Sequence, residues 1–206
     1  MSYQALNLNC PGCGSPISTN QKQCNICRRP IVITSFSDIQ SFSLLDLNRY
    51  ISQNSAALSD NPNNDGLNMS QAMCKLKLKL YDDAFSFFKI AQNSFTNSEP
   101  FFYAAIALLK GKKAFLADKT TQIDKILEYI NAAIQIEEES GVSKGIYYYF
   151  LAYIKYDFFE RKSLNTSPDW KETFEIAKRN EVTQANVDQL AELLQVKLPE
   201  CLCVSQ

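Results

Sequence analysis

Four cysteines near the N-terminus have the spacing of a metal site. Cys10 and Cys13 form one Cys-x-x-Cys pair, and Cys24 and Cys27 form a second pair further along the chain. Thiolates are favoured ligands of Zn²⁺, which binds four of them in a tetrahedron at about 2.3 Å. The two pairs therefore predict one structural Zn²⁺ ion whose coordination positions are all filled by the protein.

The residues that follow the two pairs differ. Gly14 comes directly after Cys13 and suits a turn with positive φ, which glycine adopts without strain. Arg28 follows Cys27, at a position where such turns often have glycine. Two other chemistries stay open: a redox dithiol, which needs a βαβ setting that the sequence does not predict, and an iron centre, which uses the same ligand pairs.

The whole segment NCPGCGSPISTNQKQCNICRRPIVI resembles the short zinc ribbons at the ends of many bacterial and archaeal proteins. These ribbons share a CPxCG motif, a short link and a second CxxC motif. The resemblance implies small strands, which we expect at residues 16–18 and 31–33. A segment this short cannot bury enough apolar surface to fold alone. We therefore expect the metal to supply its folding free energy, on the order of 10–16 kcal/mol.

The remaining cysteines give no further metal site on this interpretation. Cys74 lies in a helical pattern and is expected to be a small buried residue. Cys201 and Cys203 form a Cys-x-Cys pair in the last six residues, where a second ligand pair stays open as the weaker alternative because chain ends are usually poorly ordered. Since we expect a reducing compartment, cysteines should be metal ligands or free thiols rather than disulfides.

Composition argues against most enzyme classes. The chain has 206 residues, a net charge of −1 and no histidine, so the commonest general base is missing. No phosphate-binding loop or catalytic motif is found, and we expect the protein not to be an enzyme. Residues 1–37 contain Lys22, Arg28 and Arg29 but no acid, which is a mild local excess of positive charge.

The sequence also bears on cellular location. The N-terminus MSYQALNLNC has neither the basic region nor the apolar run of a signal peptide. The most apolar stretch, residues 146–154, is far too short to span a bilayer. We therefore expect a cytoplasmic protein that does not associate with membranes.

After the cysteine segment the pattern is helical. Ala72, Tyr81, Ala84, Phe88 and Ala91 follow the spacing of small and aromatic residues in tetratricopeptide (TPR) repeats, which are helical hairpins. In such hairpins small residues allow two helices to approach closely. The TPR-like pattern covers roughly residues 44–160. It implies a mainly α fold, in which TPR-like antiparallel helical hairpins form an α-solenoid, preceded by a small β zinc ribbon.

This interpretation divides the chain into four parts. They are a zinc ribbon (1–33), a linker (34–43), a TPR-like helical domain with a C-terminal helical cap (44–198) and a tail (199–206). Residues 75–80 alternate like a strand, but their helical flanks favour helix. Ser167 and Pro168 are expected to start the helix at 169–178, and Thr183 the helix at 184–195. The other predicted helices lie at 44–59, 68–91 (two helices), 98–112, 123–136 and 145–159.

Helical repeats stack into surfaces that bind other proteins. We therefore predict a zinc-binding adaptor or scaffold, whose partner, a protein, is held by the groove of the repeats. The alternative is a nucleic-acid-associated factor that contacts DNA or RNA through the basic ribbon, although three cations are few for such binding. Residues expected to face the groove are basic or aromatic: Lys75, Lys79, Phe102, Tyr103, Tyr147, Tyr148 and Tyr149.

Overall fold

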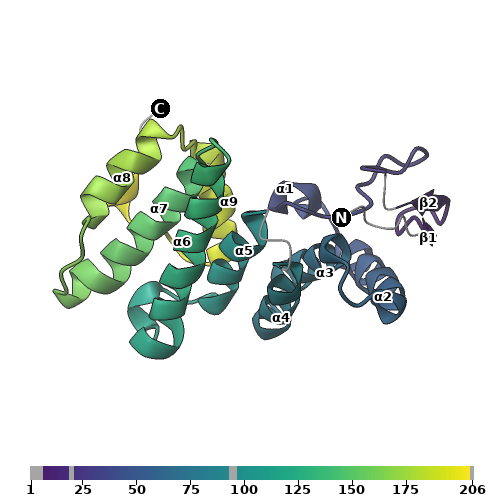
Figure 1. The fold of residues 1–206 in the computed structure, drawn as a ribbon, viewed down its shortest axis with the longest axis horizontal. Coiled ribbons are helices and arrows are strands. Elements are labelled where there is room, and N and C mark those ends of the chain that lie inside the picture. Colours follow the sequence, from purple (N-terminus) through teal and green to yellow (C-terminus); the bar gives the residue numbers. More distant parts are fainter. Residues whose placement is uncertain (1–6, 19–20, 93–96, 205–206) are drawn as a thin grey trace. The chain divides into compact units, whose positions relative to one another are not determined.

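The computed structural model describes residues 7–18, 21–92 and 97–204 (Figure 1). The prediction of a mainly α chain with a small β element near the N-terminus is confirmed. The chain divides into two compact units, Met1–Ser94 and Phe95–Gln206. The predicted ribbon and the first helices lie together in the first unit. Within the described residues, no helix combines the length and the apolar composition that crossing a bilayer requires.

The first unit begins with a β-hairpin. Strand β1 (Asn7–Asn9) pairs antiparallel with β2 (Pro16–Ser18), and Leu8 lies opposite Ile17. The strand expected at residues 31–33 is wrong, since residues 31–33 form no strand and the neighbouring chain makes only an isolated bridge between Gln23 and Pro30. Residues 31 and 33 are isoleucines that are buried without a strand partner. The two isoleucines are therefore held by packing of their side chains and not by the strand that the resemblance to zinc ribbons implied.

The segment expected as a linker, residues 34–43, carries a short helix. Helix α1 (Phe36–Ile39) buries the side chains of Phe36 and Ile39 and packs against α3. The Nζ atom of Lys77 lies 4.7 Å from the centre of the Phe36 ring. This segment is rich in serine, yet two apolar residues are enough to fix it onto the unit.

Helix α2 (Leu44–Asp60) begins at Ser43, whose hydroxyl accepts a hydrogen bond from the backbone N–H of Asp46. This is the N-cap arrangement that satisfies free N–H groups at a helix start. One face of α2 is buried, and it includes Tyr50 and Leu58. The hydroxyl of Tyr50 donates a 2.5 Å hydrogen bond to the carbonyl of Pro30. The ribbon is therefore bonded directly to the first long helix.

Helices α3 (Asp65–Lys77) and α4 (Tyr81–Ala91) pack against each other, with α3 also against α2 (Figure 1). The expected helix through residues 75–80 is only half right, because α3 ends at Lys77. Lys79 then adopts a left-handed conformation with φ of 62°, which turns the chain toward α4. The small and aromatic residues of the TPR-like pattern are buried here: Ala72, Ala84, Phe88 and Ala91.

The second unit is helical throughout its regular structure. Helix α5 (Glu99–Leu108) packs against α6 (Asp124–Glu139), and α7 (Gly145–Ile154) packs against α8 (Trp170–Arg179) and α9 (Gln184–Leu194). Thr183 caps α9 as predicted. The predicted start of α8 is wrong, because Asp169 rather than Ser167 is the N-cap. Its carboxylate accepts the N–H of Glu172 at 2.8 Å, since a carboxylate satisfies the free N–H groups of a first helical turn.

The packing of α3 on α4 generates a prediction for the free energy of unfolding. Phe88→Ala should lower it by about 3–5 kcal/mol, because truncating a fully buried ring leaves a cavity. Ala84→Leu should lower it by about 1–3 kcal/mol, because the site has no room for a larger side chain. Chemical denaturation of both variants provides the measurement. Lys89→Ala, at an exposed position of the same helix, is the control and should be nearly neutral.

Candidate metal centre

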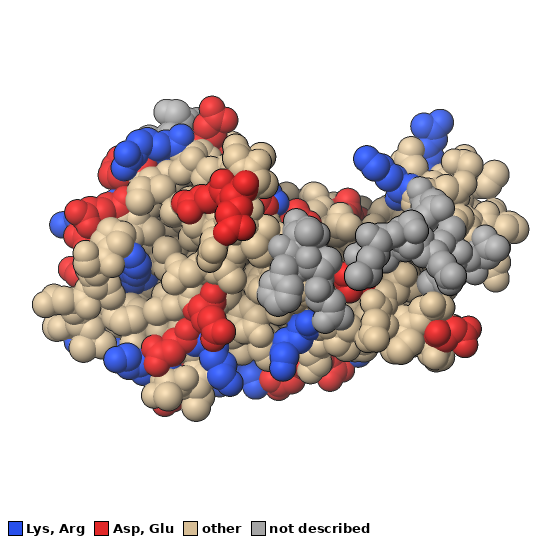
Figure 2. Space-filling model, in the orientation of Figure 1, with Lys and Arg blue, Asp and Glu red and all other residues tan. Residues whose placement is uncertain are grey.

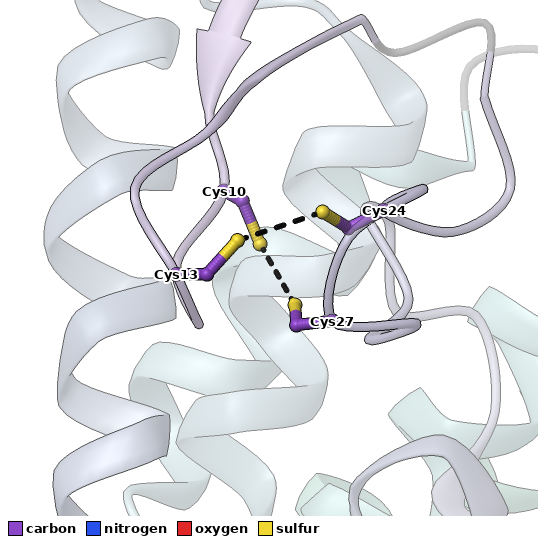
Figure 3. Close-up of side chains that lie close together, drawn as sticks. All are labelled: Cys10, Cys13, Cys24 and Cys27. Carbon is purple, nitrogen blue, oxygen red and sulfur yellow. Dashed lines mark hydrogen bonds between the residues drawn. The ribbon is translucent and has the colours of Figure 1, made fainter.

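The side chains of the four cysteines point toward one another (Figure 3). Their sulfur atoms all lie within 4.8 Å of one another. Sγ of Cys10 is 3.4 Å from Sγ of Cys27, and Sγ of Cys13 is 3.7 Å from Sγ of Cys24. Four sulfurs bound tetrahedrally at 2.3 Å from one ion would be about 3.8 Å apart. The cluster therefore has the dimensions needed to bind one metal ion.

The first Cys-x-x-Cys pair forms a tight turn directly after β1. The N–H of Gly14 donates to the carbonyl of Cys10 at 2.8 Å, and the N–H of Cys10 donates to the carbonyl of Ser15 at 2.8 Å. The N–H of Gly12 points at Sγ of Cys10, 3.4 Å away. Gly14 has a φ of 76°, as its place after the pair predicts.

The second pair repeats this turn bond for bond. The N–H of Arg28 donates to the carbonyl of Cys24 at 2.9 Å, and the N–H of Cys24 donates to the carbonyl of Arg29 at 2.8 Å. The N–H of Ile26 lies 3.4 Å from Sγ of Cys24. Arg28 occupies the position equivalent to Gly14 and has a φ of 62°. An arginine is thus held in a conformation that L-residues adopt at a cost of about 1–2 kcal/mol.

The electrostatics of the thiols follow from burial and from these N–H groups. Burial raises the pKa of Cys10 to about 12. Hydrogen bonds from Ser15 lower the pKa of the exposed Cys13 to about 6, and backbone N–H groups of Cys27 and Ile26 lower the pKa of Cys24. N–H donors stabilise thiolates, the form that ligates metal. A bound cation would add to this effect at all four sulfurs, the buried Cys10 included.

An apolar and ionic shell supports the cluster. Cys10 and Cys24 are buried together with Ile17 and Ile31. The guanidinium of Arg29 forms an ion pair with Asp46 at the start of α2 and lies 5.4 Å from the centre of the Phe42 ring. The ion pair lowers the pKa of Asp46 to about 2.

Sequence reasoning missed three residues of this shell: Gly12, Asp46 and Tyr50. A Cβ at Gly12 would lie 2.6 Å from Cδ of Arg29 and 3.1 Å from Sγ of Cys27, so this position needs glycine for space. Asp46 and Tyr50 read as ordinary polar and apolar positions of an amphipathic helix. Their contacts to Arg29 and Pro30 join segments far apart in the chain, and no local pattern signals such pairs.

Most of the seven residues predicted to face a groove do not lie at the surface. Phe102, Tyr103, Tyr147 and Tyr149 are buried, so their expected exposure in a groove is wrong. The centres of the Phe102 and Tyr147 rings lie 4.4 Å apart, and the two rings stack. Most residues of α5 and α7 are buried, so the aromatic side chains of these helices fill the core of the second unit. Of the other three, Lys79 is exposed, whereas Lys75 and Tyr148 are partly buried and engage Asp83 and Glu138.

The remaining cysteines lie as expected. Cys74 is fully buried, and burial raises the pKa of its thiol to about 12. Cys201 and Cys203 are exposed. Among the described residues, the four N-terminal cysteines form the one group of thiols or carboxylates arranged to hold a metal ion.

Comparisons of the chain with models of protein families, with curated protein sequences and with solved structures find no match. The description of the site therefore rests on its own geometry. That geometry consists of four converging thiols, two equivalent turns and a shell that connects them to α2.

The left-handed conformation of Arg28 can be tested by substitution. Arg28→Gly should stabilise the second turn by roughly 1 kcal/mol, because glycine removes the strain and the arginine side chain is exposed. Release of bound metal to a chromophoric chelator, followed as denaturant is raised, measures the effect. Gly14→Ala is the opposite control, since an added Cβ meets no atom within 4 Å and only the positive φ opposes it. A neutral Arg28→Gly with a destabilising Gly14→Ala would contradict the equivalence of the two turns.

Proposed function

We propose that the protein is an adaptor for another protein, in which one structural zinc ion organises the ribbon. The observation that carries the proposal is the closed cluster of four thiols, Cys10, Cys13, Cys24 and Cys27. Four protein ligands leave a tetrahedral ion without an open position, so the ion stabilises structure rather than activating water or substrate. Zinc is proposed because four thiolates are its usual structural ligand set, and iron is the competing metal.

Exposed apolar residues support a protein as the partner. Ile26, at the tip of the second turn, is 72% exposed, and Leu44 and Leu45 in the first turn of α2 are 66% and 60% exposed. All three belong to the unit that holds the metal cluster. Burying such exposed apolar side chains against a partner is favourable, at about 25 cal/mol per Å² of apolar surface removed from water.

Binding of nucleic acid through the ribbon has less support. Arg29 pairs with Asp46, so of the three basic residues of the ribbon only Lys22 and Arg28 are exposed. Affinity for a polyanion grows with the number of cations that contact phosphates, and two are few. On the face shown in Figure 2, basic and acidic side chains of the second unit are interspersed rather than gathered into a basic patch.

The metal proposal predicts one equivalent of zinc per chain, measured by elemental analysis of the reduced protein. Cys24→Ser should abolish binding and should also loosen α2, because Tyr50 and Asp46 bond to the ribbon. Hydrogen exchange read by mass spectrometry should show faster exchange in α2, while α5–α9 of the second unit are unchanged.

Cys201→Ser, at an exposed cysteine far from the cluster in sequence, is the matched control and should alter neither zinc content nor exchange. Iron in place of zinc, or no metal in fully reduced protein, would overturn the proposed cofactor. Unchanged exchange in α2 of the Cys24→Ser variant would show that the ribbon does not support the helix.

The adaptor proposal predicts which residues contact a partner protein. A photo-reactive amino acid placed at Ile26 or Leu45 should cross-link to a protein in cells that express the chain, because both side chains are exposed and apolar. The same group at Lys171, exposed in the second unit, is the control position. Adducts that nuclease removes, and that Lys22→Glu with Arg28→Glu abolishes, would favour nucleic acid instead. Arg29 is kept intact in this test because its ion pair joins the ribbon to α2.

A further inference from the structure

No described residue pairs as a strand with the outer edge of β1. In the described part of the chain the sheet consists of β1 and β2, so β1 has a strand on one side only. The backbone N–H of Cys10 donates to the carbonyl of Ser15, just beyond the two strands. In an antiparallel pair of strands, hydrogen-bonded and non-hydrogen-bonded residue pairs alternate. The next pair, Asn9 and Pro16, is therefore not hydrogen-bonded, and Asn9 directs its backbone N–H and C=O away from β2. Its opposite residue, Pro16, has no N–H to offer, which fits this alternation.

A groove runs beside this edge, between the ribbon and α2. One hollow of about 300 Å³ is lined by Leu8 and Asn9 of β1 and by the C-terminal half of α2. A second hollow of about 570 Å³ is lined by the first cysteine turn and by the middle of α2. Gln53 and Ala56 line both hollows, so the two adjoin along a single face of the helix, and we call them together the groove.

The helix wall of the groove suits an extended chain. Ala56 and Ala57 are small, which leaves room beside the open edge of β1 for a peptide backbone. Ser52 and Gln53 provide side-chain hydrogen-bonding groups further along. Arg49, at the end near the cysteine turn, is exposed and forms no ion pair with a described residue. An acidic side chain would complement Arg49, because the ribbon has no acid between residues 1 and 37. The one acid that lines the groove, Asp60, lies at its opposite end, near Leu8 and Asn9.

We propose that this groove binds an extended segment of a partner protein, which adds to the outer edge of β1 as a strand and brings a carboxylate to Arg49. Main-chain hydrogen bonds to Asn9 would give affinity, and the small residues and Arg49 would give selectivity. The inference rests on the proposed adaptor function and assigns the partner's chemistry. It uses a surface distinct from Ile26, Leu44 and Leu45, none of which lines the groove.

The test starts from the zinc-loaded full chain and a displayed library of random linear peptides. Selected peptides are synthesised and titrated against the wild type and Ala56→Arg, which fills the groove where its two hollows meet. Asn48→Arg, an exposed position of α2 outside the groove, is the matched control. Ala56→Arg should weaken binding roughly tenfold or more, and Asn48→Arg should leave it unchanged. Equal zinc content and circular dichroism show that the variants are folded.

Two further readouts identify the binding mode. N-methylation of each peptide amide in turn should weaken binding roughly tenfold at alternate residues, because only alternate N–H groups of an added strand face β1. The selected peptides should carry an acidic residue at the end that meets Arg49, and Arg49→Glu should weaken their binding by a similar factor, less so at high salt.

Absence of selected peptides, binding that Ala56→Arg leaves intact, or N-methylation without alternation would each overturn the inference. The cross-linking from Ile26 and Leu45 separates this failure from that of the adaptor proposal. Cross-linked protein at Ile26 or Leu45, together with no peptide binding in the groove, would support the adaptor proposal and contradict strand addition.

Discussion

The convergence of four thiols is the constraint on which the first unit depends. A ribbon of about thirty residues with two three-residue strands has too little apolar surface to hold itself together. Its buried cluster amounts to Cys10, Ile17, Cys24 and Ile31, so half of the buried residues are metal ligands on our proposal. Binding of the ion is then inseparable from folding of the ribbon. Every contact that the ribbon makes with α2 inherits this dependence.

In the second cysteine turn, the dipeptide Arg28-Arg29 connects the cysteine cluster to α2. Arg28 takes the left-handed conformation that closes the turn, and this places Arg29 so that its carbonyl bonds to Cys24 while its guanidinium reaches Asp46. Asp46 in turn hydrogen-bonds to Ser43 at the start of α2. The cysteine turn, the ion pair of Arg29 with Asp46 and the cap of α2 are thus linked by successive contacts. These contacts offset the backbone strain at Arg28.

The features predicted correctly from the sequence are those that contacts between near neighbours in the chain determine. Cysteine spacing placed the ligands, because each turn is closed by bonds between near neighbours, and amphipathic periodicity placed the helices to within a few residues. Failures occurred where distant contacts decide. Ile31 is buried without a strand partner, Phe36 ties down a serine-rich segment, and Tyr147 is buried because α7 is covered on most sides. Aromatic residues alone do not distinguish a core from a contact surface, since both favour them.

Docking of the ribbon on α2 also creates surfaces that neither part has alone. Tyr50 and Asp46 hold the ribbon, while Arg49, Gln53 and Ala56, on the adjacent face of the same helix, form one wall of the groove. The first cysteine turn and β1 form the other wall. On the functions proposed above, the metal ion contributes no ligand contact of its own. It acts by holding two walls at a fixed separation, so partner binding and metal occupancy must be thermodynamically linked.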